Sequence, residues 1–95
     1  MENNFVGPVL RMSDDIDGII SAIREDNPDK EIEVTDRGAY VRIQTENRLE
    51  LKRATVEKSL YRDYEMRELE TILSAFAGRL ETTTESFVWY FKEKL

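Results

Sequence analysis

The side chains that most often carry out chemistry are scarce in this 95-residue chain. It has no histidine, the commonest general base and metal ligand, and no cysteine, which supplies thiolate nucleophiles and soft metal ligands. It also lacks a glycine-rich loop that could hold phosphate groups. We therefore predict no catalytic residue, no cofactor-binding residue and no metal ligand. A chain with this inventory is expected to act by binding another molecule.

Two groups of carboxylates need separate interpretation. Asp15-Ile16-Asp17-Gly18 resembles the start of a calcium loop, but the twelfth position, where a bidentate glutamate is required, holds Asp26. We interpret this segment as the start of a helix. Glu65, Glu68 and Glu70 belong to one short predicted helix and are interpreted as its solvated face, because carboxylate metal sites of this kind also need histidine. A hydrolase that uses paired carboxylates stays open as one alternative function, beside the two that are given below.

The segment from Glu31 to Lys52 has the clearest structural pattern. Apolar and polar residues alternate in three short runs, as is typical of strands with one face on a core and the other in water. Gly38 and Asn47 stand in the two turns between the runs, where residues that tolerate positive φ are preferred. The pattern predicts an antiparallel meander whose inward-facing residues are Ile32, Val34, Ala39, Val41, Ile43, Leu49 and Leu51.

The segment before this meander predicts one strand and one helix. Val9 to Met12 is expected to form a short strand after an irregular lead-in over Phe5 to Pro8, because Pro8 has no N–H to donate. Ser13 is expected to cap a helix that ends at Asn27-Pro28. Its apolar stripe consists of Ile16, Ile19, Ile20 and Ile23.

The segment after the meander predicts two short helices and a hairpin. Thr55 is expected to cap the first helix, and the second begins near Met66 and ends near Ser74. Residues 75–78 are expected to be flexible. Residues 79–82 and 86–92 form the predicted closing hairpin. Its last strand is apolar on both faces, so it is expected either to be central in a sheet or to have one face against another layer. Phe87, Trp89 and Phe91 share one face of it, for which core packing is preferred over stacking of nucleobases or a partner contact.

The resulting order is β-α-β-β-β-α-α-β-β. It predicts a compact single α+β domain, residues 1–95, in which about three short helices cover a largely antiparallel sheet, with residues 1–4 as a mobile tail. The net charge of -6 disfavours nucleic acid and membrane as partners and favours a basic or neutral protein surface. No apolar run is long enough to span a membrane, and no signal peptide is evident, so we expect a cytoplasmic protein.

Four segments together resemble a known family. They are Asn4 to Arg11, Glu25 to Ile32, Asp36 to Ile43 and Ser74 to Arg79. In this order and spacing the chain resembles the effector, or coupling, proteins of soluble diiron monooxygenases, with most likeness to those of toluene, alkene and isoprene monooxygenases. The resemblance extends from Asn4 to Phe91. The N-terminal tail is much shorter than in effectors of the methane type, so no role of that tail is carried over.

The resemblance implies a function that the residues alone do not. Such an effector holds no cofactor and performs no chemistry; it docks on the hydroxylase component, over the helices that carry the diiron ligands. It thereby couples NADH-derived electrons to O₂ activation and hydrocarbon oxidation. A Rieske-type ferredoxin is expected to compete for an overlapping surface, and the free effector is expected to be a monomer. The alternative is a small-molecule-binding α+β regulatory module.

We place the predicted partner interface on two segments of small residues, each with one phenylalanine and no evident requirement in the fold. The first comprises Asn3, Asn4, Phe5, Val6, Gly7 and Pro8. The second comprises Ser74, Ala75, Phe76, Ala77 and Gly78.

Overall fold

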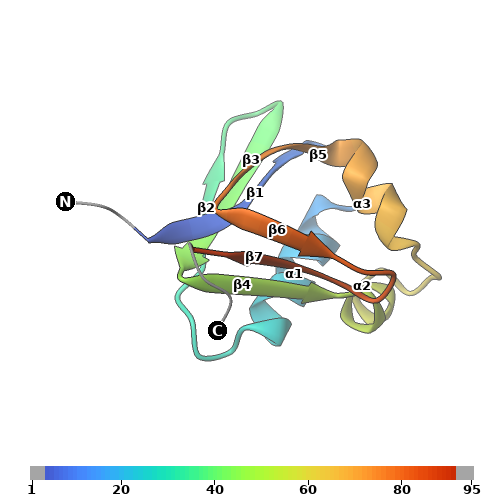
Figure 1. Cartoon of the computed structure of the whole chain (residues 1–95). Helices are drawn as coiled ribbons and strands as arrows, with labels where there is room; N and C mark the ends of the chain where they lie inside the picture. Colours follow the sequence, from blue (N-terminus) through green and yellow to red (C-terminus); the bar gives the residue numbers. More distant parts are fainter. Residues whose placement is uncertain (1–3, 92–95) are drawn as a thin grey trace.

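The computed structural model describes residues 4–91. Three helices and seven strands follow one another along this part of the chain (Figure 1). The helices are α1 (Ile16–Asp26), α2 (Arg53–Leu60) and α3 (Met66–Ile72). The strands are β1 (Phe5–Arg11), β2 (Glu33–Asp36), β3 (Tyr40–Glu46), β4 (Arg48–Lys52), β5 (Leu73–Ala77), β6 (Arg79–Thr82) and β7 (Ser86–Tyr90).

The strands form two antiparallel sheets. One has the order β2-β3-β1-β5 and the other the order β4-β7-β6. The α+β class with antiparallel pairing is therefore confirmed, as is the closing hairpin of β6 and β7. The predicted three-stranded meander is wrong in its last strand, because β4 leaves β3 and pairs with β7 across the register Leu49–Trp89.

The chain crosses between the two sheets at two residues with left-handed backbone. Asn47, with φ of 67°, joins β3 to β4, and Gly78, with φ of 87°, joins β5 to β6. Single positive-φ residues reverse chain direction within a short space, and Asn and Gly are the residues that adopt them at least cost. The Asn47 N–H donates to the Asn4 carbonyl, and the Asn47 carbonyl accepts from the Phe91 N–H. Both backbone polar groups of Asn47 are therefore hydrogen-bonded, which holds this crossing in place.

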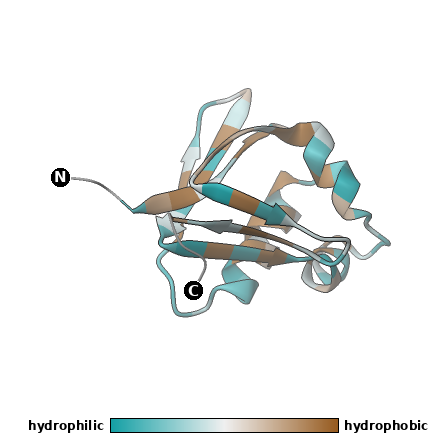
Figure 2. Ribbon diagram, in the orientation of Figure 1, coloured by the Kyte–Doolittle hydropathy of each residue, from teal (hydrophilic) through white to brown (hydrophobic). Residues whose placement is uncertain are grey.

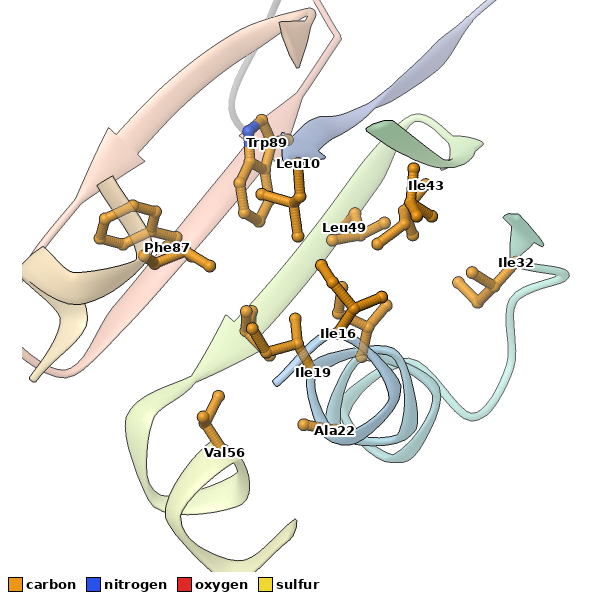
Figure 3. Packing of buried hydrophobic residues seen from close by; sticks show 14 of the residues in the cluster. Leu10, Ile16, Ile19, Ala22, Ile32, Ile43, Leu49, Val56, Phe87 and Trp89 are labelled. Atoms are coloured by element: carbon orange, nitrogen blue, oxygen red, sulfur yellow. The ribbon is translucent and has the colours of Figure 1, made fainter. Parts of the chain in front are cut away.

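The core lies between the sheets and α1. Apolar and polar residues alternate along β4 and β6 in Figure 2, and the apolar ones face inward. Figure 3 shows Ile16 and Ile19 of α1 pointing toward Leu49 of β4. The predicted isoleucine stripe is confirmed, with Ile20 only partly buried. Phe87 and Trp89 are buried in this core, and β7 is the central strand of its sheet, which is one of the two positions predicted for it.

Both predicted helix caps are wrong. Helix α1 begins after Asp15, which makes no side-chain cap bond, and the Ser13 hydroxyl accepts from the Asp15 N–H at 3.3 Å instead. Helix α2 begins at Arg53, so Thr55 lies within it. The Thr55 hydroxyl donates to Asp26 Oδ1 at 2.6 Å, and the Lys52 N–H donates to Asp26 Oδ2 at 2.8 Å. Asp26, at the end of α1, thus links α1 to the first turn of α2.

Candidate docking surface

The pairing of β1 with β5 brings together the two segments predicted to form an interface. Gly7 lies opposite Ala77, Pro8 opposite Phe76 and Val9 opposite Ala75. Both segments were expected to be irregular, and the structure corrects this. Phe5 to Pro8 is the first half of β1, and Ser74 to Ala77 lies in β5, a strand absent from the predicted order. Helix α3 correspondingly ends at Ile72 rather than near Ser74.

The two segments differ in exposure. Strand β1 is flanked by β3 and β5, and Val6, Gly7 and Pro8 are buried, so these three serve the fold rather than a free surface. Phe5 is half-buried and Asn4 is exposed, while Asn3 lies outside the described residues. The N-terminal half of the predicted interface is therefore mostly inaccessible to a partner.

Strand β5 is the accessible half. It forms the edge of its sheet, and Ser74, Ala75 and Phe76 are exposed, as is Gly78 after it. The side chain of Phe76 is 45% exposed, although a phenylalanine gains free energy by burial. An edge strand with small side chains leaves its backbone groups open to another surface. These properties are typical of an interaction site rather than of a strand that serves only the fold.

Contacts at both ends hold β5 in place. At the start, the Arg11 guanidinium donates to the carbonyl of Thr71, near the end of α3. Helix α3 itself begins with a capping box, in which the Glu65 N–H donates to Glu68 Oε2 at 2.8 Å. At the other end, a Cβ on Gly78 would stand 2.6 Å from Val6 Cγ1 and 2.7 Å from the Tyr90 carbonyl oxygen. These contacts therefore fix the position of β5 at both of its ends.

Charged side chains around the start of α3 form a group of ion pairs. Arg53 pairs with Glu57 at 3.3 Å, Glu85 at 3.2 Å and Glu65 at 3.8 Å, and so joins α2, α3 and the β6–β7 turn. The Tyr64 backbone N–H donates to Glu57 Oε2 and, together with the nearby Arg53 guanidinium, holds the pKa of Glu57 below its usual value. These carboxylates are engaged in structural contacts.

The surface of the described residues includes two hollows. Residues 4–91 include no group of three or more carboxylates placed to hold a metal ion. One hollow of about 430 Å³ lies between α3 and the β6–β7 turn, and another of about 350 Å³ is lined by Phe5, Lys30, Asn47 and several carboxylates. No helix within residues 4–91 is long and apolar enough to cross a membrane.

Sequence reasoning missed two exposed apolar side chains near β5. Met12 is 43% exposed and Tyr40 is 42% exposed, at adjacent ends of β1 and β3. Tyr40 lies opposite Arg11, and the Met12 N–H donates to the Ala39 carbonyl at 2.8 Å. The signal was present for Tyr40, because its alternation with Val41 places it on the solvent face of the strand.

The comparisons with known proteins agree with one another. The MmoB/DmpM family matches residues 4–90. The effector subunit of an alkene monooxygenase system from Xanthobacter autotrophicus is 41% identical over 92 residues, which cover 97% of this chain and 91% of that protein. The stimulatory component DmpM of a phenol 2-monooxygenase from Pseudomonas sp. is 31% identical over 74 residues, covering 78% of this chain and 80% of that protein.

Solved structures show the same fold. A chain in a structure of a phenol hydroxylase–regulatory protein complex aligns with a TM-score of 0.80 and 31% identity, covering 93% of this chain and 99% of that one. A second such structure gives a TM-score of 0.74 and 33% identity, over 92% and 99% of the two chains. The regulatory protein B of soluble methane monooxygenase shares the fold at 24% identity and a TM-score of 0.68, over 97% of this chain and 68% of that one.

Proposed function

Because the chain belongs to the MmoB/DmpM family, we propose that it is the non-catalytic effector subunit of a multicomponent diiron monooxygenase and binds the hydroxylase component. The observation that carries this is the 41% identity with an alkene monooxygenase effector over nearly the whole of both chains. The expectation drawn from the resemblance of four sequence segments is confirmed at the level of the family. The relatives are named effector, stimulatory or regulatory components.

The docking element that we propose is the exposed strand β5, in which Phe76 is the large exposed side chain. A standard interface buries about 800 Å² on each partner, and this chain has 5964 Å² of accessible surface over its described residues. A single face of the chain can therefore supply an interface of this size. Phe76 provides an aromatic anchor of the kind that dominates binding energy, beside small residues that allow close approach of the two backbones.

The effector acts on the hydroxylase by binding one of its conformations better than another. A ligand with equal affinity for both conformations shifts nothing. A tenfold change in their ratio requires about 1.4 kcal/mol of differential affinity, which a few side chains can supply. In this scheme the effector reshapes the hydroxylase active site and couples electron transfer to oxidation of the hydrocarbon. It acts in the cytoplasm as a monomer when free, and a Rieske-type ferredoxin competes for an overlapping hydroxylase surface.

Reconstitution tests the proposal directly. The chain is added to the purified hydroxylase, ferredoxin and reductase, and the product formed per NADH is measured. An increase that saturates with effector concentration is expected. No change at saturating concentration, or turnover of a substrate by the chain alone, would refute the function.

Two variants test the role of β5. Phe76→Ala should weaken hydroxylase binding while the melting temperature changes little, because nearly half of the Phe76 surface is already exposed to solvent. Tyr61→Asn is the matched control: it removes a 94% exposed aromatic ring from the α2–α3 loop, and Asn suits the left-handed backbone there. Equal effects of the two variants on binding, or a collapse of stability in Phe76→Ala, would exclude β5 as the docking element.

A further inference from the structure

The outer face of the β2-β3-β1-β5 sheet carries a continuous row of side chains. Thr35 lies opposite Arg42, Arg42 opposite Val9, and Val9 opposite Ala75. Residues directly opposite one another in antiparallel strands project from the same side of the sheet. The row therefore crosses all four strands and ends on β5. The neighbouring residues Val41 and Ile43 of β3 are buried, which shows that the row faces away from the core.

This face is open to solvent. Thr35, Arg42 and Ala75 are exposed, and Val9 is only half-buried. Among the described residues, four large hydrophobic side chains are exposed, and one of them, Tyr40, alternates with Val41 as Arg42 does and so projects from this face. Phe76 follows Ala75 in β5 and lies opposite Pro8, so it projects from the other side of this edge strand. The outer face thus carries one large exposed aromatic side chain, Tyr40.

The charge of the face differs from that of the chain. Twenty acidic residues outnumber fourteen basic ones, yet the centre of the row is an arginine. Within residues 4–91, Arg42 takes part in none of the ion pairs, whereas Arg48, Arg53 and Arg62 each pair with carboxylates. Glu33, opposite Gln44, lies toward the other end of β3 from Tyr40. The face thus presents an unpaired guanidinium beside an exposed tyrosine, and interface cores are enriched in both residue types.

We propose that the docking surface on β5 continues across this outer face to Tyr40 and Arg42, and that Arg42 pairs with a carboxylate of the hydroxylase. This inference rests on the proposed function and deepens it by naming the chemistry of the partner surface. The occupant is an apolar surface of the hydroxylase bordered by at least one Asp or Glu side chain. The row reaches the docking strand at Ala75, so a partner that covers the edge of β5 contacts Phe76 on one side of this strand and the row on the other. A guanidinium binds a carboxylate through two parallel hydrogen bonds, which fixes the orientation of the bound partner.

A pair of charge-reversal variants tests the proposal. Arg42→Glu places a negative charge in the row, whereas Arg24→Glu makes the same change in net charge on α1. Arg24 is also exposed and also forms no ion pair within the described residues, so it is a matched control. The probe is the purified hydroxylase component of the chain's own monooxygenase, titrated at low ionic strength. Arg42→Glu should raise the Kd at least about tenfold, and Arg24→Glu should change it by less than about twofold.

A neutral variant separates charge from packing. Arg42→Gln should lose affinity and also show a weaker dependence of Kd on salt than the wild-type chain, because one ion pair across the interface is gone. Tyr40→Ser should lose affinity without changing the salt dependence. The melting temperatures of these exposed variants should stay close to that of the wild-type chain.

The outcomes distinguish this inference from the proposed function. If the wild-type chain binds and Phe76→Ala weakens binding, but Arg42→Glu and Arg24→Glu have equal effects, the outer face is not part of the interface and only the present inference fails. If the wild-type chain neither binds the hydroxylase nor alters its product yield, both fail. A tenfold loss confined to Arg42→Glu supports both.

Discussion

Gly7 of β1 lies so close to Ile43 of β3 that a Cβ atom on Gly7 would stand 2.0 Å from the Ile43 carbonyl oxygen. The backbone of Gly7 also has φ of 140°, a conformation that residues with side chains rarely adopt. Gly7 therefore meets two requirements at once, backbone geometry and space. This contact fixes the centre of the sheet from which β5, the proposed docking strand, is built.

Replacement of this glycine should destabilise the fold. We expect Gly7→Ala to lower the free energy of unfolding by about 3 kcal/mol or more, since backbone strain and overpacking each cost about 1–3 kcal/mol. Gly38→Ala is the matched control, because Gly38 has φ of 82° but nothing within 4 Å of the added Cβ. It should lose about 1 kcal/mol from strain alone. Urea denaturation measures both, and equal losses would show that the contact with Ile43 relaxes freely.

Asn27 joins the end of α1 to β4 through its side-chain amide. Its Nδ2 donates to the carbonyls of Ile23 at 2.7 Å and Glu50 at 2.8 Å, and its Oδ1 accepts from the Glu50 N–H at 3.0 Å. We expect Asn27→Ala to lower the free energy of unfolding by about 2–3 kcal/mol, because backbone groups of β4 are left without partners. Lys58→Ala breaks the exposed pair with Glu25 and should cost less than about 0.5 kcal/mol. Similar losses of stability for the two variants in thermal melts would contradict the role that we assign to Asn27.

Glu57 should contribute to acid sensitivity. The Tyr64 backbone N–H and then Arg53 hold its folded-state pKa below the ordinary value of 4.5. Its contribution to stability is therefore fully present above about pH 4.5 and is lost as the pH falls through the depressed folded-state pKa. We expect Glu57→Gln to be less stable than the wild-type chain at pH 7, with the difference shrinking below pH 4.5. A difference that stays constant from pH 7 to pH 3 would assign the effect to packing instead.

Tyr64 should make the protein sensitive to alkali. Burial raises its pKa to about 12, and the carboxylates of Glu68 and Asp15 add to the shift while Arg62 opposes it. Because the folded state disfavours the phenolate, this contribution to stability is present below pH 10 and is lost as the pH rises toward 12. We expect Tyr64→Phe to lose less stability than the wild-type chain between pH 10 and 12. Ultraviolet titration of the folded protein should show one late-titrating tyrosine that is absent from the variant.

Local sequence patterns were sufficient for much of the fold. The alternation of Val41 and Ile43 with Arg42 correctly predicted which side of β3 is buried, because a period of two is a property of every strand. Asn27-Pro28 marked the end of α1, since a proline restricts the residue before it. The two-sided apolar pattern of Phe87 to Trp89 limited this strand to a central position or a place against another layer, and β7 is central. Each of these signals depends on a residue and its near neighbours alone.

The pairing of strands did not follow from such signals. Strand β4 leaves β3 at Asn47 and pairs with β7, although a short turn between alternating runs usually indicates a hairpin. Backbone hydrogen-bonding groups are the same in every strand, so the pattern of side chains does not select the partner. The accessible part of the candidate site shows the same limit. Apart from Phe76, the residues from Ser74 to Ala77 are small and have low strand propensity, and this segment pairs with β1 alone.

The amino-acid sequence by itself determined that this protein has no histidine and no cysteine, which face of each predicted strand is apolar, and which family its motifs resemble. Only the tertiary structure decided that Phe5 to Pro8 is mostly buried, that Phe76 is exposed, and that Thr35, Arg42, Val9 and Ala75 form one row. The physical reason is that side-chain type and periodicity are local, whereas exposure and neighbourhood depend on which distant strands share hydrogen bonds.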